Sequence, residues 1–279
     1  MQLEEILSYF ARLIEDELGI VYSEVNYFQL ENRLEEISKL SGYSGIVQLH
    51  AEALKGLSGA AKQLLFDLAT NNETSFFRDP KVFKSLELSL KEILSQRGSK
   101  EPLRIWSAAS STGQEALTIS ILLTEWKTKN QVDFNFEITA TDISDRVLKR
   151  AKSFEYSQLE IQRGLPAPLL IKYFTKDNQD KWLASKQVSK NIQHKSLNLK
   201  SQFTFPDRFD VIFCRNVLIY QNIQRKIEIL DRVTSCLCPG GLLIVGSGES
   251  VVGLSSEYEH VHIDGAIFYR KKQMRLNAA

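Results

Sequence analysis

The sequence predicts an α/β protein with a mostly parallel sheet, a small all-α domain before it and a small β insert within it. The first seventy residues carry apolar side chains at helical spacing. From residue 103 onward, short apolar runs alternate with helical patterns, which is typical of a parallel sheet covered by helices on both faces. Residues 258–270 predict a C-terminal antiparallel hairpin that turns at Asp264-Gly265.

The all-α domain is predicted to span residues 1–72. Apolar residues indicate a first helix between Leu3 and Ile14. The apolar positions of the second helix, which should end near Gly42, are Val25, Phe28, Leu34 and Ile37. A third helix is predicted over 46–54, and a fourth follows Ser58, its expected N-cap, up to about residue 70.

The second domain is predicted to span residues 73–279, and a long helix between Val82 and Leu94 leads into it. The predicted strands and helices, in order, are strand 103–107, helix 113–127, strand 136–141, helix 144–153, strand 209–214, helix 222–236 and strand 242–246. The turn Leu237-Cys-Pro-Gly-Gly241 should precede the last of these strands.

Residues 154–200 do not follow this alternation. Leu165-Pro-Ala-Pro168 breaks the chain, and the apolar residues Trp182, Val188 and Ile192 stand among polar ones. We interpret about 155–195 as a small antiparallel β subdomain inserted into the second domain.

The bulk composition argues against several function classes. The 279 residues include 35 Lys+Arg and 34 Asp+Glu, a net charge of +1, whereas a dominant nucleic-acid-binding footprint would require a basic excess; a local basic patch is not excluded. No apolar run is long enough to span a bilayer, and the first residues, Met-Gln-Leu-Glu-Glu, do not resemble a signal peptide. We therefore expect a cytoplasmic protein with no membrane insertion and no nucleic-acid partner.

The residue types that bind metals do not form a convincing ligand set. Cys236-Leu-Cys238 has no second ligand pair at a suitable spacing, so buried thiols are the better interpretation of the cysteines. His260 and His262 fall on one face of a predicted strand, where a solvated hairpin edge is favoured over a metal pair. We expect no metal.

Two segments point to a small-molecule site. Residues 71–80, Asn-Asn-Glu-Thr-Ser-Phe-Phe-Arg-Asp-Pro, place polar side chains on a loop before a helix. Residues 106–115, Trp-Ser-Ala-Ala-Ser-Ser-Thr-Gly-Gln-Glu, run from a strand through a turn of small residues into a helix. Free backbone N–H groups at such a turn suit a nucleotide, although a single glycine makes the turn alone no more than a helix cap.

Asp142 follows a predicted strand directly, at the edge of the sheet where open α/β proteins bind ligands. Its carboxylate is suited to accept hydrogen bonds from the two ribose hydroxyls of a nucleoside. The alternative is that Asp142 or Ser144 only caps the next helix; Ser144 is the better cap, which leaves Asp142 for a ligand.

The block Phe209–Tyr220 is the most specific segment. Its apolar half should be buried in the sheet, so that Arg215 and Asn216 emerge at the carboxyl end of a strand and Tyr220 lies one helical turn further on. Taken singly, Arg215 reads equally well as a surface charge and Tyr220 as a core aromatic residue.

Together these motifs resemble those of the CheR family, the chemotaxis receptor methyltransferases, over roughly residues 1–270. The matching blocks are Trp-Ser-Ala followed by Ser-Thr-Gly-x-Glu, and Cys-Arg-Asn-x-x-x-Tyr; Ala116 stands where the family usually has proline. The resemblance implies the class I S-adenosylmethionine (SAM) methyltransferase fold, which is Rossmann-like, with SAM as cofactor and S-adenosylhomocysteine as product. By this resemblance, Glu115 contacts the SAM amino group, Arg78 and Tyr220 face the transferred methyl group as catalytic residues, and the cofactor-binding residues are Asn72, Thr74, Arg78, Glu115, Asp142, Asn198, Leu199, Arg215 and Asn216.

The family's reaction converts glutamate side chains of chemoreceptor cytoplasmic domains to methyl esters in chemotaxis adaptation. Relatives often dock through basic residues of the helical domain; here Arg33 is retained, but Glu35 and Glu36 adjoin it. Relatives that bind a C-terminal pentapeptide tether of the receptor carry a glycine-containing loop in the insert, and Lys176–Lys190 has no glycine. We therefore expect weak or absent tether binding.

Two other functions stay open at this stage. A CheR-like methyltransferase that acts on another protein or a small molecule outside chemotaxis fits the same fold, since the acceptor is chosen in the region of poorest resemblance. A non-catalytic SAM-binding scaffold is disfavoured, because Arg78, Asp142 and Tyr220 are all present. An RNA methyltransferase is disfavoured by the charge balance and by the absence of an Asn-Pro-Pro-Tyr-type loop.

Overall fold

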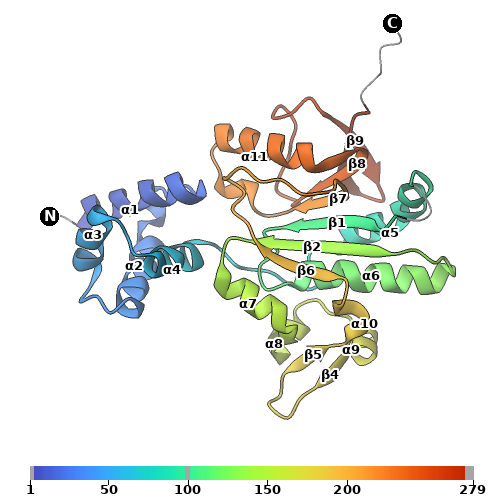
Figure 1. Cartoon of the computed structure of the whole chain (residues 1–279), viewed down its shortest axis with the longest axis horizontal. Helices are drawn as coiled ribbons and strands as arrows, with labels where there is room; N and C mark the ends of the chain where they lie inside the picture. The colour runs from blue at the N-terminus through green and yellow to red at the C-terminus, as the bar shows by residue number, and fades with distance from the viewer. Residues whose placement is uncertain (1–2, 98–100, 274–279) are drawn as a thin grey trace, which may run out of the picture.

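The computed structural model describes residues 3–97 and 101–273, in which helices at the N-terminus lie beside a larger α/β part (Figure 1). The helices have a hydrophobic cluster of their own, while the strands and their covering helices form two further clusters. The site described below lies where the two parts meet.

The N-terminal part is a bundle of four helices that pack around Phe10, Leu30, Leu34 and Leu49, all with 0% exposure. Ser58 caps the fourth helix as expected, because its side chain accepts a hydrogen bond from the backbone N–H of Ala61. The elements are α1 (Leu3–Leu18), the short 3₁₀ helix η1 (Glu24–Asn26), α2 (Tyr27–Leu40), α3 (Ile46–Lys55) and α4 (Gly59–Ala69).

Two of the expected apolar positions in the second helix are not in the core. Val25 lies in η1 and is 91% exposed, and Phe28 is 72% exposed. The buried stripe of α2 follows Leu30, Leu34 and Ile37, and Phe28, two residues before Leu30, falls on the opposite side of the helix.

The α/β part is built on a seven-stranded sheet in the order β6-β2-β1-β7-β8-β10-β9 (Figure 1). Its first five strands in this order are parallel, and β10 and β9 close it as an antiparallel hairpin, as expected. The strands are β1 (Leu103–Ala108), β2 (Phe136–Asp142), β6 (Ile192–Ser196), β7 (Phe209–Cys214), β8 (Leu237–Val245), β9 (Tyr258–Ile263) and β10 (Ala266–Lys271).

Alternation along the strands divides the core of the α/β part into two layers. In β1, Ile105 belongs to the cluster under α5 and α6, while Trp106 belongs to the cluster under α11. The sheet is therefore covered on both faces, as the apolar strands predicted. The covering helices are α5 (Pro80–Ser95), α6 (Gln114–Asn130), α7 (Asp145–Ser153) and α11 (Ile223–Cys236).

The chain leaves β1 toward β2 on one side of the sheet and returns to β7 on the other. The carboxyl ends of β1 and β7 thus flank the topological switch point, where ligands bind in open α/β sheets.

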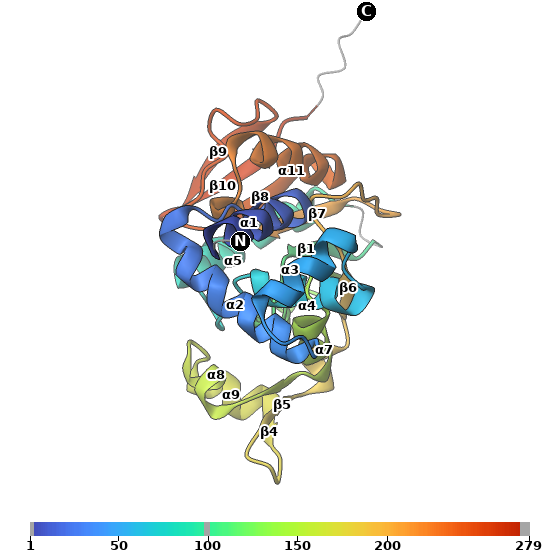
Figure 2. The ribbon, with the colours of Figure 1, turned by 90° about the vertical axis from the view of Figure 1, so that its left-hand side faces the viewer.

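The insert extends from the side of the sheet below α6 and α7 (Figures 1 and 2). A three-stranded antiparallel sheet of order β3-β5-β4 is present, together with three short helices that the sequence did not predict. These elements are β3 (Glu155–Tyr156), α8 (Gln158–Gln162), α9 (Ala167–Tyr173), β4 (Phe174–Lys176), β5 (Trp182–Ala184) and α10 (Lys186–Ser189).

The predicted end of the insert at about residue 195 is wrong, because β6 is the edge strand of the main sheet and pairs in parallel with β2. Its sequence, Ile-Gln-His-Lys-Ser, has one apolar residue, since an edge strand with one exposed side needs few. The strand predicted at 242–246 likewise begins earlier, at Leu237. The Pro-Gly-Gly segment lies inside β8, where the pairing with β7 shifts register.

The cysteines and the two histidines of the C-terminal hairpin lie as expected. Cys214 and Cys236 are buried free thiols and Cys238 is partly buried. His260 and His262 are exposed on β9, at the edge of the sheet. In the described parts of the chain, no helix combines the length and the apolar composition that crossing a membrane requires.

Candidate functional site

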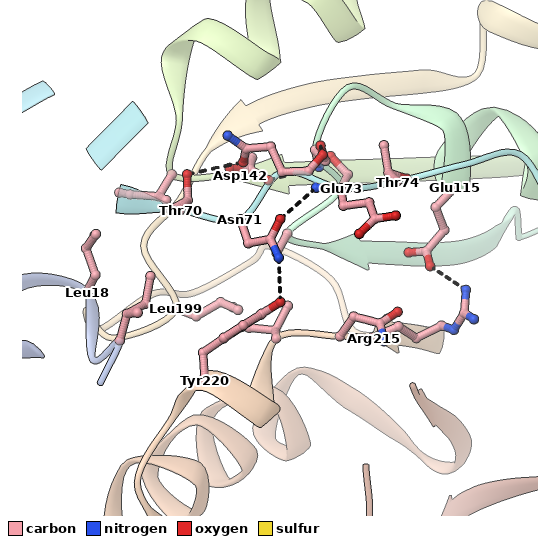
Figure 3. A pocket seen from close by; sticks show the side chains of 18 of the residues that line it. Leu18, Thr70, Asn71, Glu73, Thr74, Glu115, Asp142, Leu199, Arg215 and Tyr220 are labelled. Atoms are coloured by element: carbon pink, nitrogen blue, oxygen red, sulfur yellow. Dashed lines mark hydrogen bonds and ion pairs between the residues drawn. The ribbon is translucent and has the colours of Figure 1, made fainter. Parts of the chain in front are cut away.

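All ten residues predicted for the site line one pocket, at the carboxyl ends of β1, β2 and β7 (Figure 3). The segment between α4 and α5 forms one wall, and Leu18 at the end of α1, with Ile20 after it, lines the pocket from the helical side. The predicted residues that line it are Asn72, Thr74, Arg78, Glu115, Asp142, Asn198, Leu199, Arg215, Asn216 and Tyr220.

The turn between β1 and α6 has an unusual backbone. Ala109 and Ser111 have positive φ values of 56° and 51°, and Gly113 has 91°. The turn is held by the neighbouring strand, since the backbone N–H of Ser110 donates to the carbonyl of Thr141 (2.8 Å). Strained backbone that its surroundings fix in this way concentrates at functional sites.

Asp142 is 5% exposed and holds two loops with its carboxylate. One oxygen accepts from the backbone N–H of Ser111 (2.9 Å) and the other from that of Ser144 (3.0 Å). Burial raises the pKa of Asp142 above its ordinary value, against these hydrogen bonds, which lower it. Each oxygen keeps a further lone pair, so the carboxylate can still receive a hydroxyl donor.

Ser144 is the N-cap of α7, as predicted, because its hydroxyl oxygen accepts from the backbone N–H of Val147 (3.3 Å). The same hydroxyl donates to the carboxylate of Asp67 in α4 (2.7 Å). Asp67 therefore ties the helical part to the strand end that carries Asp142, a role that no motif in the sequence indicated.

Arg215 is nearly fully buried, with a side chain 2% exposed, and it is not a surface charge. Its guanidinium donates to the carboxylates of Glu115 (3.0 Å) and Asp79 (2.5 Å) and to the backbone carbonyl of Arg78 (2.9 Å). Glu115 also accepts from the hydroxyl of Ser107 (2.7 Å). Two carboxylates share one guanidinium here, which leaves a net negative charge beside the pocket and favours a cationic ligand group.

Arg78 and Tyr220 both line the pocket and come from distant parts of the chain. The guanidinium of Arg78 donates to the backbone carbonyl of Glu73 (3.0 Å) and is partly exposed. The hydroxyl of Tyr220 accepts from the side-chain amide of Asn71 (2.8 Å; Figure 3). Both side chains can therefore meet a second molecule that enters from solvent.

The route from Asn216 to Tyr220 is not the helical turn that the spacing predicted. Asn216 has a positive φ of 58°, and only Leu218–Tyr220 form a turn, the 3₁₀ helix η2. Leu218 is buried and Ile219 exposed, so this turn presents Tyr220 to the pocket.

Asn198 joins the two parts of the molecule. Its side-chain amide donates to the backbone carbonyl of Glu17 at the end of α1 (3.0 Å), and its oxygen accepts from the backbone N–H of Lys200 (2.9 Å). Leu199 lines the pocket next to Leu18, which gives this end an apolar surface that suits an aromatic ring.

Several lining residues were not predicted. Asn71 and Glu73 belong to the block 71–80, from which Asn72 and Thr74 were predicted. Their position next to these residues could have indicated them. Leu18 and Ile20 gave no signal, because they read as ordinary core positions of a helix and its end. The further lining residues are Leu18, Ile20, Thr70, Asn71, Glu73, Ser75, Ala109, Ser110, Ser111, Ile143, Leu197, Val217, Gln221 and Ile229.

Arg33, which the resemblance assigned to docking, is engaged inside the molecule. Its guanidinium donates to the hydroxyl of Tyr22 and to the backbone carbonyl of Ala69 (2.7 Å), and burial lowers its pKa. It joins α2 to the end of α4. For metals, residues 3–97 and 101–273 contain no group of three or more His, Cys, Asp or Glu side chains that could hold an ion.

Comparisons with known proteins relate the chain to methyltransferases. Residues 72–267 match the family model described as "CheR methyltransferase, SAM binding domain". The chain is 32% identical over 265 residues to "Chemotaxis protein methyltransferase Cher2" of Pseudomonas putida KT2440, a match that covers 94% of this chain and 96% of that protein. It is 33% identical over 267 residues to the "Chemotaxis protein methyltransferase" of Vibrio anguillarum, with coverage of 94% and 95%.

A solved structure with a similar fold is that of the N-methyltransferase NodS from Bradyrhizobium japonicum WM9 in complex with S-adenosyl-L-homocysteine. The match covers 74% of this chain and 94% of that one, with a TM-score of 0.41 and 16% identity. Such a distant likeness carries no argument about the site.

Proposed function

The chain belongs to the CheR methyltransferase family, and we propose that it methylates glutamate side chains of chemoreceptor cytoplasmic domains to methyl esters. As a member of that family it is a SAM-dependent methyltransferase of chemotaxis with the class I methyltransferase fold. The glutamate acceptor, the release of S-adenosylhomocysteine, the cytoplasmic location and a division into domains 1–72 and 73–279 are parts of the proposal.

The observation that carries the proposal is the convergence of all ten predicted residues on one pocket. Its carboxylates suit SAM as hydrogen-bond acceptors: Glu115 lies beside the pocket for an ammonium group, and Asp142 for ribose hydroxyls. Leu18 and Leu199 offer an apolar surface for the adenine ring.

When bound, SAM supplies an electrophilic methyl group on a sulfonium. The acceptor carboxylate needs no general base, because a free glutamate titrates near 4.3 and is ionised at neutral pH. The protein must instead remove water from the carboxylate and hold it in line with the methyl group. We assign these tasks to Arg78, which can orient a carboxylate, and to Tyr220, which can donate a hydrogen bond or line the methyl channel.

A second candidate is methylation of another acceptor outside chemotaxis. It is favoured by the helical part, where Arg33 is bound internally and Glu35 and Glu36 are exposed. The guanidinium of Arg33 is therefore not free for docking as the resemblance implies, and the two carboxylates beside it oppose an acidic partner. The non-catalytic scaffold stays disfavoured, since Arg78 and Tyr220 both line the pocket.

The test is transfer from methyl-labelled SAM to a panel of chemoreceptor cytoplasmic fragments, followed by mild base. Release of the label as volatile methanol is the expected result, because base hydrolyses a carboxyl methyl ester. Label that survives base would indicate N-methylation. SAM binding without transfer to any fragment would favour the second candidate.

A further inference from the structure

The loop that follows β7 turns several backbone N–H groups toward one point. Asn216 has a left-handed backbone with φ of 58°, which reverses the chain, and η2 begins two residues later. Successive N–H groups in such a turn form a concave site for an anion.

The anion is supplied by the protein itself, from the loop after β8. One oxygen of the Glu249 carboxylate accepts from the backbone N–H of Asn216 (2.7 Å) and of Gly246 (2.7 Å). The other oxygen accepts from the backbone N–H of Val217 (2.9 Å) and of Ile219 (3.1 Å). A single carboxylate thus satisfies four backbone donors, three of them in the loop that leads to Tyr220.

Gly246 leaves the space that this arrangement needs. A Cβ at Gly246 would lie 2.8 Å from the Glu249 carboxylate, 2.8 Å from the side-chain nitrogen of Asn216 and 3.0 Å from its backbone nitrogen. Two independent features, the carboxylate and the absent side chain, therefore fix the same loop.

Residues of the loop that Glu249 holds also line the pocket. Asn216 and Tyr220 both do so, and Tyr220 is hydrogen bonded across the pocket to Asn71. Charged hydrogen bonds to a carboxylate are roughly twice as strong as neutral ones. A loop held by four of them gives Tyr220 a defined place before any ligand binds.

We propose that Glu249 is a positioning residue for methyl transfer, which acts by holding the Asn216–Tyr220 loop so that Tyr220 meets the acceptor. The inference rests on the proposed function, because Tyr220 is there assigned to the reacting groups. Glu249 itself does not line the pocket and touches neither reactant.

The principal test is a double-mutant cycle of Glu249→Gln and Tyr220→Phe, with Glu257→Gln as a control that removes the same charge from an exposed site. The glutamine amide would turn N–H donors toward two backbone donors and displace the loop. We expect Glu249→Gln to lower kcat at least tenfold with a smaller change in the Kd for SAM, and Glu257→Gln to change neither. In the Tyr220→Phe background most of the effect of Glu249→Gln should disappear. Effects that multiply independently would overturn the proposal.

Amide hydrogen exchange provides a readout that does not depend on the acceptor. The N–H groups of residues 216, 217 and 219 should exchange faster in Glu249→Gln, while strands β1 and β2 keep their protection. This result would hold even if the wild-type protein transferred methyl groups to no chemoreceptor fragment, so the two proposals fail separately. Unchanged exchange at these three amides would overturn the role of Glu249.

Gly246→Ala is the second variant, should Glu249→Gln not fold. The added methyl group would displace the Glu249 carboxylate, so Gly246→Ala should lower kcat by moving the same loop. Most of this effect on kcat should disappear in the Tyr220→Phe background. A Gly246→Ala protein with wild-type kcat would contradict the proposal.

Discussion

Arg78 and Tyr220 show what single residues contribute at this site. Among the described interactions, the guanidinium of Arg78 makes one hydrogen bond, to the backbone carbonyl of Glu73. The guanidinium of Arg215 is buried and donates to three partners. Arg215 is thus a buried structural residue of the pocket wall, whereas Arg78 keeps N–H donors for an entering carboxylate. Their roles in the proposed reaction differ for that reason.

Replacing Arg78 tests this difference. We expect Arg78→Ala to lower kcat roughly 100-fold, equivalent to about 2.7 kcal/mol, because the acceptor loses its orienting group. The Kd for SAM should change much less. Arg78→Lys keeps the charge without the planar guanidinium, so its kcat should lie between those of the wild type and Arg78→Ala. Steady-state kinetics and calorimetric SAM titration measure both quantities, and equal losses in kcat and SAM affinity would contradict the assignment.

His194 gives a prediction about pH. It lies in β6 against the ring of Phe154, and burial, with a smaller effect of Lys152, lowers its pKa from 6.5 to about 4. The folded protein therefore resists protonation of His194, while the unfolded chain takes the proton below pH 6.5. The contribution of His194 to stability is complete above pH 6.5 and is lost as the pH falls toward about 4.

Urea unfolding at pH 7.5 and pH 5 measures this loss. The free energy of unfolding should fall less on acidification in His194→Gln than in the wild type. His262→Gln, an exposed change on β9, should behave as the wild type does. An equal fall in His194→Gln would mean that other groups account for the pH dependence.

Much of the site could be predicted at the residue scale, because each predicted residue follows a strand end or lies in a loop with a distinctive sequence. Asp67, Asn71 and Glu249 were missed for a physical reason. They act by hydrogen bonds to residues far along the chain, and a lone Asp or Glu in a sequence does not indicate which backbone groups it will meet.

At the scale of elements, the β1–α6 turn gives the sharpest prediction. Gly113 has a φ of 91°, and an added Cβ would lie 3.2 Å from the Cβ of Ala151 in α7. Gly253 has a φ of 75° but open space around it, so Gly253→Ala measures the backbone cost alone. That cost is about 1 kcal/mol for an L-residue in the left-handed region.

We expect Gly113→Ala to destabilise the protein by more than Gly253→Ala, and to weaken SAM binding, which Gly253→Ala should leave intact. The reason is that the shift of α7 needed to admit the methyl group also moves Asp142. Denaturant unfolding and SAM titration of both variants provide the comparison. Equal destabilisation would mean that the turn and α7 adjust without cost.

At this scale, strands could be predicted where both of their faces are covered and their side chains are therefore mostly apolar. The strands β1 and β7 are central, and most of their residues are apolar. The edge strand β6 and the exposed Phe28 were misread, because an edge strand needs few apolar residues and a surface helix tolerates single exposed ones. Local composition does not report which side of an element will be covered.

Across the whole molecule, charge is unevenly distributed. Residues 1–72 contain 5 Lys+Arg and 11 Asp+Glu, a net charge of −6, which leaves +7 for residues 73–279. The helices at one side of the pocket therefore repel an acceptor rich in carboxylates, unless it approaches over the α/β part.

Reversing exposed charges on α2 tests which side the acceptor uses. If a chemoreceptor segment passes over the helices, Glu35→Lys with Glu36→Lys should lower the KM for the acceptor several-fold, and the effect should shrink in high salt. The kcat and the Kd for SAM should not change. Glu257→Lys with Glu259→Lys, which makes the same change near β9, is the control. No change in KM for the α2 variant would exclude these helices from the approach path.

The pocket also lies at the boundary between the helical part and the α/β part. Leu18 and Ile20 from the helical part line it together with Asp142 and Asn216 from the α/β part, and Asn198 hydrogen bonds across this boundary to Glu17. A ligand that contacts both parts binds best when the two parts are docked against each other. By linkage, a higher ligand concentration therefore favours the docked state. The supply of methyl donor in a cell would then govern more than the rate of transfer. It would set how long the N-terminal helices stay docked, and hence how readily a protease finds the linker before α5.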